Sequence, residues 1–145
     1  MTYNVFVYGT LMNEKVFFSV TRENPNYQEA ILENHFRFAL KKRVYPGILK
    51  NTNSNINGLL VENISKKTLI LLDLFEDSIY DRRSLEIKKK DFSYTRAYVY
   101  VLKDRYKYLS LGKSWDLDNF EKNNLNEYLI GCREFYINNI NCAFL

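Results

Sequence analysis

Short runs of β-forming residues dominate the first half of the chain. Val5–Tyr8 is a continuous apolar run that stops at Gly9, which is typical of a buried strand that enters a turn. Residues 27–44 predict one or two strands, followed by a turn at Tyr45-Pro46-Gly47. Residues 51–57 are almost entirely Asn, Ser and Thr and predict an exposed hairpin tip.

Further strands are predicted downstream of this polar segment. Residues 59–64 follow it as a strand, and residues 85–87 and 97–101 alternate in a way that predicts two antiparallel strands. The turn between these two is expected at residues 91–93.

Helical spacing appears in three places. Asn13 and Ser65 are placed to cap two helices, and the second helix is expected to end at about Asp77. A C-terminal amphipathic helix is predicted beyond an acidic cap at Asp116 or Asp118. Because hairpins outnumber crossover units, we predict an α+β fold: a small mixed, mostly antiparallel β-barrel with peripheral helices.

Length and composition restrict the class of protein. The 145 residues predict a single domain over residues 1–145, and 46% hydrophobic with 26% charged residues is typical of a folded chain. No run approaches the roughly 18 apolar residues of a membrane span, and the N-terminus lacks the pattern of a signal peptide. We therefore expect a cytoplasmic protein without a membrane partner.

The few cysteines and the single histidine exclude several kinds of site. Cys132 and Cys142 have no CxxC spacing, which indicates neither a zinc site nor a disulfide framework. His35 alone cannot build a two-histidine metal site, and its apolar neighbours favour a structural role. The cysteines and the histidine therefore give no indication of a metal site.

The turn after the first strand is a candidate anion site. Gly9 allows a sharp turn, and the backbone N–H groups of Gly9, Thr10 and Leu11 could then face a ligand, reinforced by the following helix N-terminus. A plain turn explains the same pattern.

A second candidate lies at the end of the helix after Ser65. If Glu76 faces inward, burial and the nearby acids Asp73 and Asp77 raise its pKa towards that of a general base. The alternative is a solvated helix end in which Glu76 pairs with Arg82 or Arg83.

These segments together resemble the γ-glutamylcyclotransferase-like family, in its AIG2-like and γ-glutamylamine cyclotransferase branches. The resemblance covers nearly the whole chain and is carried by Tyr8-Gly9-Thr10-Leu11, Tyr45-Pro46-Gly47 and Leu72-Asp73-x-Phe75-Glu76-x-x-x-Tyr80-x-Arg82. The chain departs from the pattern at Asp77, where many relatives have glycine. This departure leaves the substrate open.

The resemblance implies a fold and a chemistry. It implies a small mixed β-barrel, a γ-glutamyl small-molecule substrate, and release of 5-oxoproline by a cyclotransferase without metal or cofactor. Glu76 matches the catalytic acid/base residue. Tyr8, Gly9, Thr10, Leu11 and Tyr80 match substrate-binding positions, and the protein is expected as a monomer or homodimer.

Two other functions remain as alternatives. One is a non-catalytic γ-glutamylcyclotransferase-like interaction domain, since a fold does not settle the chemistry. The other is a weakly basic nucleic-acid-binding module, indicated by a net charge of +4 and the clusters Lys41-Lys42-Arg43 and Lys88-Lys89-Lys90. A solvated strand edge that discourages aggregation explains those clusters more simply, so we expect no nucleic-acid partner.

Overall fold

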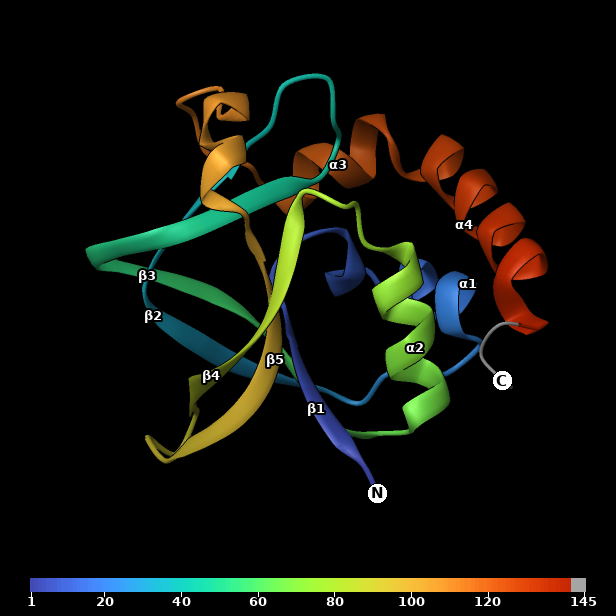
Figure 1. Ribbon diagram of the computed structural model, residues 1–145, viewed down its shortest axis with the longest axis horizontal. Coiled ribbons are helices and arrows are strands. Elements are labelled where there is room, and N and C mark those ends of the chain that lie inside the picture. The colour runs from blue at the N-terminus through green and yellow to red at the C-terminus, as the bar shows by residue number, and fades with distance from the viewer. Residues whose placement is uncertain (142–145) are drawn as a thin grey trace.

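Five strands form a closed barrel in the computed structural model, which describes residues 1–141 (Figure 1). Around the barrel the order is β1-β3-β2-β4-β5. The strands are β1 (Tyr3–Val7), β2 (Tyr27–Ala39), β3 (Pro46–Ile64), β4 (Tyr80–Lys89) and β5 (Tyr94–Leu102).

All neighbouring strands are antiparallel except one pair. The pair β1 and β5 is parallel, with Val5 opposite Tyr98, and it closes the barrel. The predicted mixed, mostly antiparallel barrel is therefore confirmed.

The polar segment at residues 51–57 is part of a strand, so the predicted hairpin tip is wrong. Strand β3 continues through it, and the turn that joins β2 to β3 lies earlier, before Pro46. The β2–β3 pairing shifts register between Glu33 and His35, and Asn34 and Asn53 both have positive φ (59° and 71°). Bulges of this kind bend a strand sharply, as barrel closure requires, and Figure 1 shows β3 turning a corner there.

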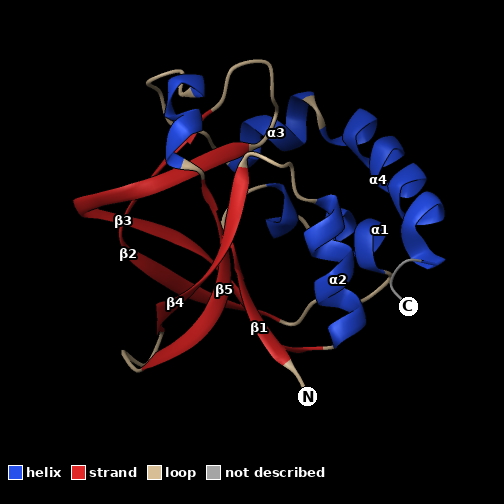
Figure 2. Ribbon diagram, in the orientation of Figure 1, coloured by secondary structure: helices blue, strands red, loops and turns tan. Residues whose placement is uncertain are grey.

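Within residues 1–141, four α-helices lie outside the barrel, and α1, α2 and α4 gather on one side of it (Figure 2). They are α1 (Glu14–Thr21), α2 (Lys66–Phe75), α3 (Leu117–Asn123) and α4 (Leu125–Asn139), with 3-10 turns at Thr10–Met12 and Asp104–Leu109. None of the helices among residues 1–141 is both long and apolar enough to cross a membrane.

The caps predicted at Asn13 and Ser65 are confirmed. Asp116 instead caps the short α3, and the predicted C-terminal amphipathic helix, α4, has no side-chain hydrogen bond at its N-cap. Asn13 Oδ1 accepts from the N–H groups of residues 15 and 16, Ser65 Oγ from Thr68, and Asp116 Oδ1 from Asn119 at 2.9 Å. Each cap satisfies N–H groups that a helix start leaves without a partner.

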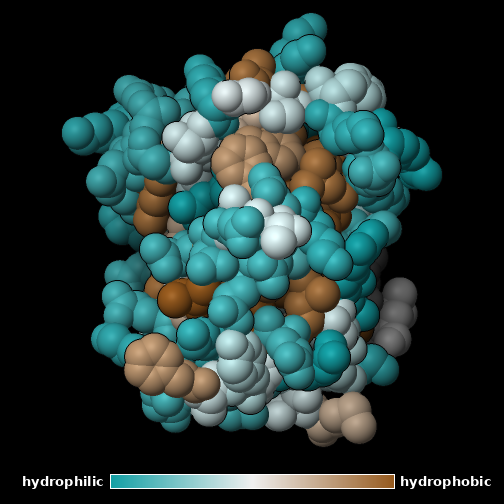
Figure 3. Space-filling view, turned by 90° about the vertical axis from the view of Figure 1, so that its left-hand side faces the viewer, coloured by the Kyte–Doolittle hydropathy of each residue, from teal (hydrophilic) through white to brown (hydrophobic). Residues whose placement is uncertain are grey.

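Buried side chains form two groups. One fills the barrel interior and includes Phe6, Leu32, Ile48 and Leu60. The other packs helices against the barrel and includes Phe17, whose side chain is fully buried. The end of the barrel formed by β2 and β3 is mainly hydrophilic, with small separate hydrophobic spots (Figure 3).

Candidate active site

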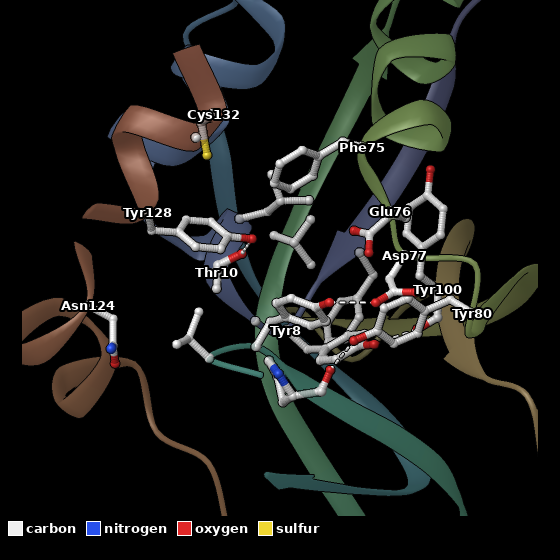
Figure 4. A pocket seen from close by; sticks show the side chains of 18 of the residues that line it. Tyr8, Thr10, Phe75, Glu76, Asp77, Tyr80, Tyr100, Asn124, Tyr128 and Cys132 are labelled. Carbon is white, nitrogen blue, oxygen red and sulfur yellow. Dashed lines mark hydrogen bonds between the residues drawn. The ribbon is translucent and has the colours of Figure 1, made fainter. Parts of the chain in front are cut away.

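A cavity of about 580 Å³ lies between the barrel and α4. Its volume falls in the range of roughly 300–1,000 Å³ that holds small ligands. Figure 4 shows Tyr128 and Cys132 on α4 on one side, and Glu76, Asp77, Tyr80 and Tyr100 on the other. The lining residues are Phe6, Val7, Tyr8, Gly9, Thr10, Leu11, Val44, Tyr45, Pro46, Phe75, Glu76, Asp77, Tyr80, Tyr100, Asn124, Glu127, Tyr128, Gly131 and Cys132.

All the residues predicted for the site meet in this cavity. Residues 8–11, Glu76 and Tyr80 are among the lining residues although they come from two widely separated parts of the chain. Their individual roles stay predictions. Cys132 also lines the cavity, but burial raises the pKa of its thiol to about 12, so it is not a thiolate at neutral pH. Cys142 lies outside the described residues.

The loop of residues 8–11 has every carbonyl group engaged. The Tyr8 carbonyl accepts from Arg37 Nη1 at 2.8 Å, and the Gly9 and Thr10 carbonyls accept from the N–H groups of residues 12 and 13. The Leu11 carbonyl accepts from the hydroxyl of Tyr27. Four carbonyls in succession are thereby fixed away from a ligand.

The amides of the same loop are unoccupied. Within residues 1–141, the N–H groups of Gly9, Thr10 and Leu11 donate no hydrogen bond to another residue. All three residues line the cavity, as an anion cradle there would require. The first N–H groups of any helical turn lack an internal partner, so a plain turn explains the open amides as well, and the cradle stays a prediction.

Gly9 is required by close packing. A Cβ at this position would lie 2.9 Å from Pro46 Cδ, at the start of β3. The same proline is held from behind, since the hydroxyl of Tyr80 donates to its carbonyl. Tyr80 therefore braces the cavity wall as well as lining it.

Glu76 faces the cavity because α2 ends one residue before it. The helix prediction extended to about Asp77, but Glu76 has extended backbone angles (φ −67°, ψ 138°) and follows the last helical residue, Phe75. Its side chain is partly exposed and lines the cavity, where Figure 4 shows it beside Asp77. Within residues 1–141 its carboxylate accepts no hydrogen bond and forms no salt bridge.

Burial raises the pKa of Glu76 to about 8, and the charges of Asp77 and Asp73 act in the same direction. The alternative in which Glu76 pairs with an arginine is wrong. Arg82 Nη1 lies 2.6 Å from Asp73 Oδ2, and Arg83 Nη2 lies 3.9 Å from Asp81 Oδ2. A carboxyl group with a pKa near neutrality can both accept and return a proton.

Asp77 is held differently from Glu76. Its Oδ2 accepts from the Tyr45 hydroxyl at 2.5 Å and from Arg43 Nε at 3.2 Å. Burial acts to raise the pKa of Asp77, but these hydrogen bonds outweigh it and hold the pKa below its ordinary value. Asp77 is therefore a structural anion that ties the segment before β3 to the end of α2.

Tyrosines surround Glu76, and the sequence analysis identified only two of them as site residues. The charge of Glu76 contributes to raising the pKa of Tyr8, Tyr80, Tyr100 and Tyr128, although burial is the larger cause for each. Tyr100 and Tyr128 were missed because alternation on a strand and apolar spacing on a helix predict buried faces without separating a cavity wall from a core.

Solved structures with the same architecture define the class of protein. A solution structure from Arabidopsis thaliana matches with a TM-score of 0.70 at 22% identity, covering 92% of this chain and 81% of that one. A structure described as a gamma-glutamyl cyclotransferase matches with a TM-score of 0.61 at 10% identity, covering 92% and 87%. The chain has the γ-glutamylcyclotransferase-like fold.

Sequence similarity establishes the family. The profile described as "Gamma-glutamyl cyclotransferase, AIG2-like" matches residues 5–128. AIG2-like protein C of Arabidopsis thaliana is 32% identical over 139 residues, which cover 94% of this chain and 79% of the relative. AIG2-like protein D of the same plant is 31% identical, covering 92% and 88%. The chain belongs to the AIG2-like γ-glutamyl cyclotransferase family.

Proposed function

We propose that this protein is a cyclotransferase that releases 5-oxoproline from a γ-glutamyl amine or γ-glutamyl amino compound. The observation that carries the proposal is the cavity itself, in which the unpaired carboxyl of Glu76 and the unoccupied amides of residues 9–11 line one space. These are the two elements that the reaction needs: a proton acceptor and an anion clamp.

The cradle of residues 9–11 supplies the clamp. Its N–H groups bind the α-carboxylate of the substrate and hold the α-amine close to the γ-carbonyl. Holding two reacting groups in this geometry can lower the activation free energy of the ring closure by several kcal/mol.

Glu76 supplies the proton transfer. Its carboxylate takes a proton from the α-ammonium, the free amine attacks the γ-carbonyl carbon, and a tetrahedral intermediate forms. The protonated Glu76 then returns the proton to the leaving nitrogen as the C–N bond breaks. The products are 5-oxoproline and the free amine, and no water is consumed.

The raised pKa of Glu76 suits this exchange. With a pKa of about 8, Glu76 differs little from an amine in proton affinity, so neither transfer is steeply uphill. Because the carboxylate form starts the reaction, we expect kcat/KM to rise with pH up to about 8.

A substrate screen tests the proposal directly. The purified protein is incubated with γ-glutamyl amino acids, γ-glutamyl amines and glutathione, and 5-oxoproline is measured. We expect release from at least one of these compounds, and loss of release in Glu76→Gln by about 10²-fold to 10⁴-fold. Full turnover by a folded Glu76→Gln protein would contradict the role of Glu76, and inertness of the wild type towards all three classes would contradict the function.

The basic clusters give less support to a nucleic-acid-binding module. Lys88, Lys89 and Lys90 each lie within 4.0 Å of a glutamate oxygen, on Glu33, Glu62 and Glu29. Arg43 of the other cluster is engaged with Asp77. Lysines beside acids present a weaker positive field to a phosphate backbone than the sequence alone indicates. The open cavity likewise favours an enzyme over a pure interaction domain.

A further inference from the structure

We propose that Arg37 is a positioning residue for the ligand cradle, which fixes the Tyr8–Gly9 peptide so that its N–H faces the cavity. The inference rests on the proposed function, because the cradle is there the clamp for the substrate carboxylate. Arg37 belongs to β2 and is not one of the residues that line the cavity. It acts on the ligand only through the loop.

The direction of the Gly9 amide follows from the hydrogen bond that Arg37 makes. Arg37 Nη1 donates to the Tyr8 carbonyl at 2.8 Å. The peptide bond is planar and trans, so its C=O and N–H groups point in opposite directions. Holding the carbonyl towards β2 therefore turns the Gly9 N–H away from β2.

The guanidinium is itself well anchored. The same Nη1 lies 3.3 Å from the carbonyl of Asn57, and the guanidinium carbon lies 5.8 Å from the centre of the Trp115 ring. Burial lowers the pKa of Arg37, yet an arginine remains charged at neutral pH. A planar group held by two carbonyls and an aromatic ring can define one orientation of the loop.

A charged donor also strengthens the amide beyond positioning it. Hydrogen bonds that share a peptide group polarise one another, so a cation on the carbonyl makes the N–H on the other side a better donor. The series of hydrogen bonds runs from the guanidinium through the Tyr8–Gly9 peptide to the substrate carboxylate. Loss of Arg37 should weaken ground-state binding of the γ-glutamyl group more than it slows proton transfer at Glu76, which stands on a different element.

The test compares two substitutions with a matched control. Arg37→Met keeps the apolar stem and removes the donors, while Arg37→Lys restores a charge and a donor. Arg96→Met is the control, because Arg96 is an exposed arginine on β5 whose Nη1 donates to a strand carbonyl, that of Ser84, at 2.9 Å. All three proteins are measured with a γ-glutamyl substrate that the wild type turns over.

We expect KM to rise by about 10-fold to 100-fold in Arg37→Met with a smaller fall in kcat, as for loss of a hydrogen bond to a charged group. Arg37→Lys should recover part of the loss, and Arg96→Met should match the wild type. An unchanged KM in a folded Arg37→Met protein, or an equal change in Arg96→Met, would overturn the proposal.

A second measurement needs no turnover and separates this inference from the proposed function. The ¹⁵N-labelled proteins are compared by the chemical shift of the Gly9 amide. Arg37→Met should shift that resonance, whereas Arg96→Met should not. If the amide is unaffected by Arg37→Met, the positioning role is wrong even when the wild type is active. If the amide responds while no γ-glutamyl compound reacts, Arg37 still orients the loop and it is the proposed function that fails.

Discussion

The surroundings of Glu76 disfavour the ionised form of its carboxyl group. A carboxyl enclosed by protein without a hydrogen-bond donor is expensive to ionise, and this is why its pKa rises from the ordinary 4.5 to about 8. Sites that need a general base near neutrality are built in this way, at some cost to stability.

The cost of ionising Glu76 predicts that the wild type and Glu76→Gln differ in free energy of unfolding by an amount that depends on pH. From about pH 4.5 to about pH 8 the folded wild type keeps the Glu76 proton that the unfolded chain has lost, so its free energy of unfolding falls as pH rises. Glutamine has no such proton. The stability of Glu76→Gln relative to the wild type should therefore increase across this window, by roughly 1–4 kcal/mol in total, and level off above it.

Urea unfolding of both proteins at several pH values measures this difference. A difference that stays constant from acid to alkaline pH would show that Glu76 is not held protonated by the fold.

A second prediction at this scale concerns Gly9. In Gly9→Val the Cβ would lie 2.9 Å from Pro46 Cδ, so the loop must move away from β3 and misplace its amides. We expect KM for a γ-glutamyl substrate to rise at least about tenfold, with a stability loss of about 1–3 kcal/mol. Steady-state kinetics and thermal unfolding check the two effects, and Thr10→Ser should leave KM close to that of the wild type. A normal KM in folded Gly9→Val would count against the cradle.

Among the elements, strand β3 shows where sequence reasoning stopped. The polar run at residues 51–57 has turn composition, and residues 51, 52, 53, 55 and 57 are indeed exposed. Whether such a run makes a tip or bends a strand depends on pairing with β2, which no local pattern encodes. The caps at Asn13 and Ser65 were predictable because a cap is a local interaction.

The candidate site likewise contains residues that a local motif identifies and residues that only the fold brings together. Glu76 and residues 8–11 were identified from motifs, whereas Tyr100 and Tyr128 line the cavity only because the barrel and α4 bring them there. The end of α2 shows that a small error in a predicted helix boundary changes the geometry of the site. A helix one turn longer would carry Glu76 on helical geometry instead of the extended backbone it has.

Substitution of two different glycines by alanine is expected to change stability in opposite directions. A Cβ on Gly58 in β3 would lie 2.6 Å from the carbonyl oxygen of Val7 and 2.5 Å from Phe6 Cζ, whereas a Cβ on Gly131 in α4 would have no atom within 4 Å. We expect Gly58→Ala to lower the free energy of unfolding by about 1–3 kcal/mol. Gly131→Ala should raise it by about 0.5–1 kcal/mol through helix propensity. Denaturant unfolding of the two variants measures both effects. An unchanged free energy of unfolding in Gly58→Ala would mean that β1 and β3 are less closely packed than described.

For the whole molecule, buried tyrosines predict the response to alkali. Burial raises the pKa of Tyr45 to about 12 and the pKa values of Tyr8, Tyr80, Tyr100 and Tyr128 further from their ordinary value of 10. The folded chain thus holds protons that the unfolded chain loses above about pH 10, and stability must fall as pH rises beyond it.

Titration by the ultraviolet absorbance of tyrosinate, followed together with circular dichroism, measures this. Only part of the 12 tyrosines should ionise near pH 10, and the remainder should ionise together with loss of the fold. Ionisation of all of them near pH 10 in a protein that keeps its circular dichroism would contradict the enclosed setting of the cavity.

The parallel seam between β1 and β5 also sets an order of assembly. Val5 pairs with Tyr98, and the Tyr8 hydroxyl donates to the Tyr100 carbonyl at 2.5 Å, so the cradle near the N-terminus is completed by residues synthesised some ninety positions later. Contacts between such distant residues form late, because a long loop must close first. A chain still emerging from the ribosome has the Tyr-Gly-Thr-Leu segment but no cavity around it. The carboxyl of Glu76 is thus enclosed by the cavity only in the finished molecule.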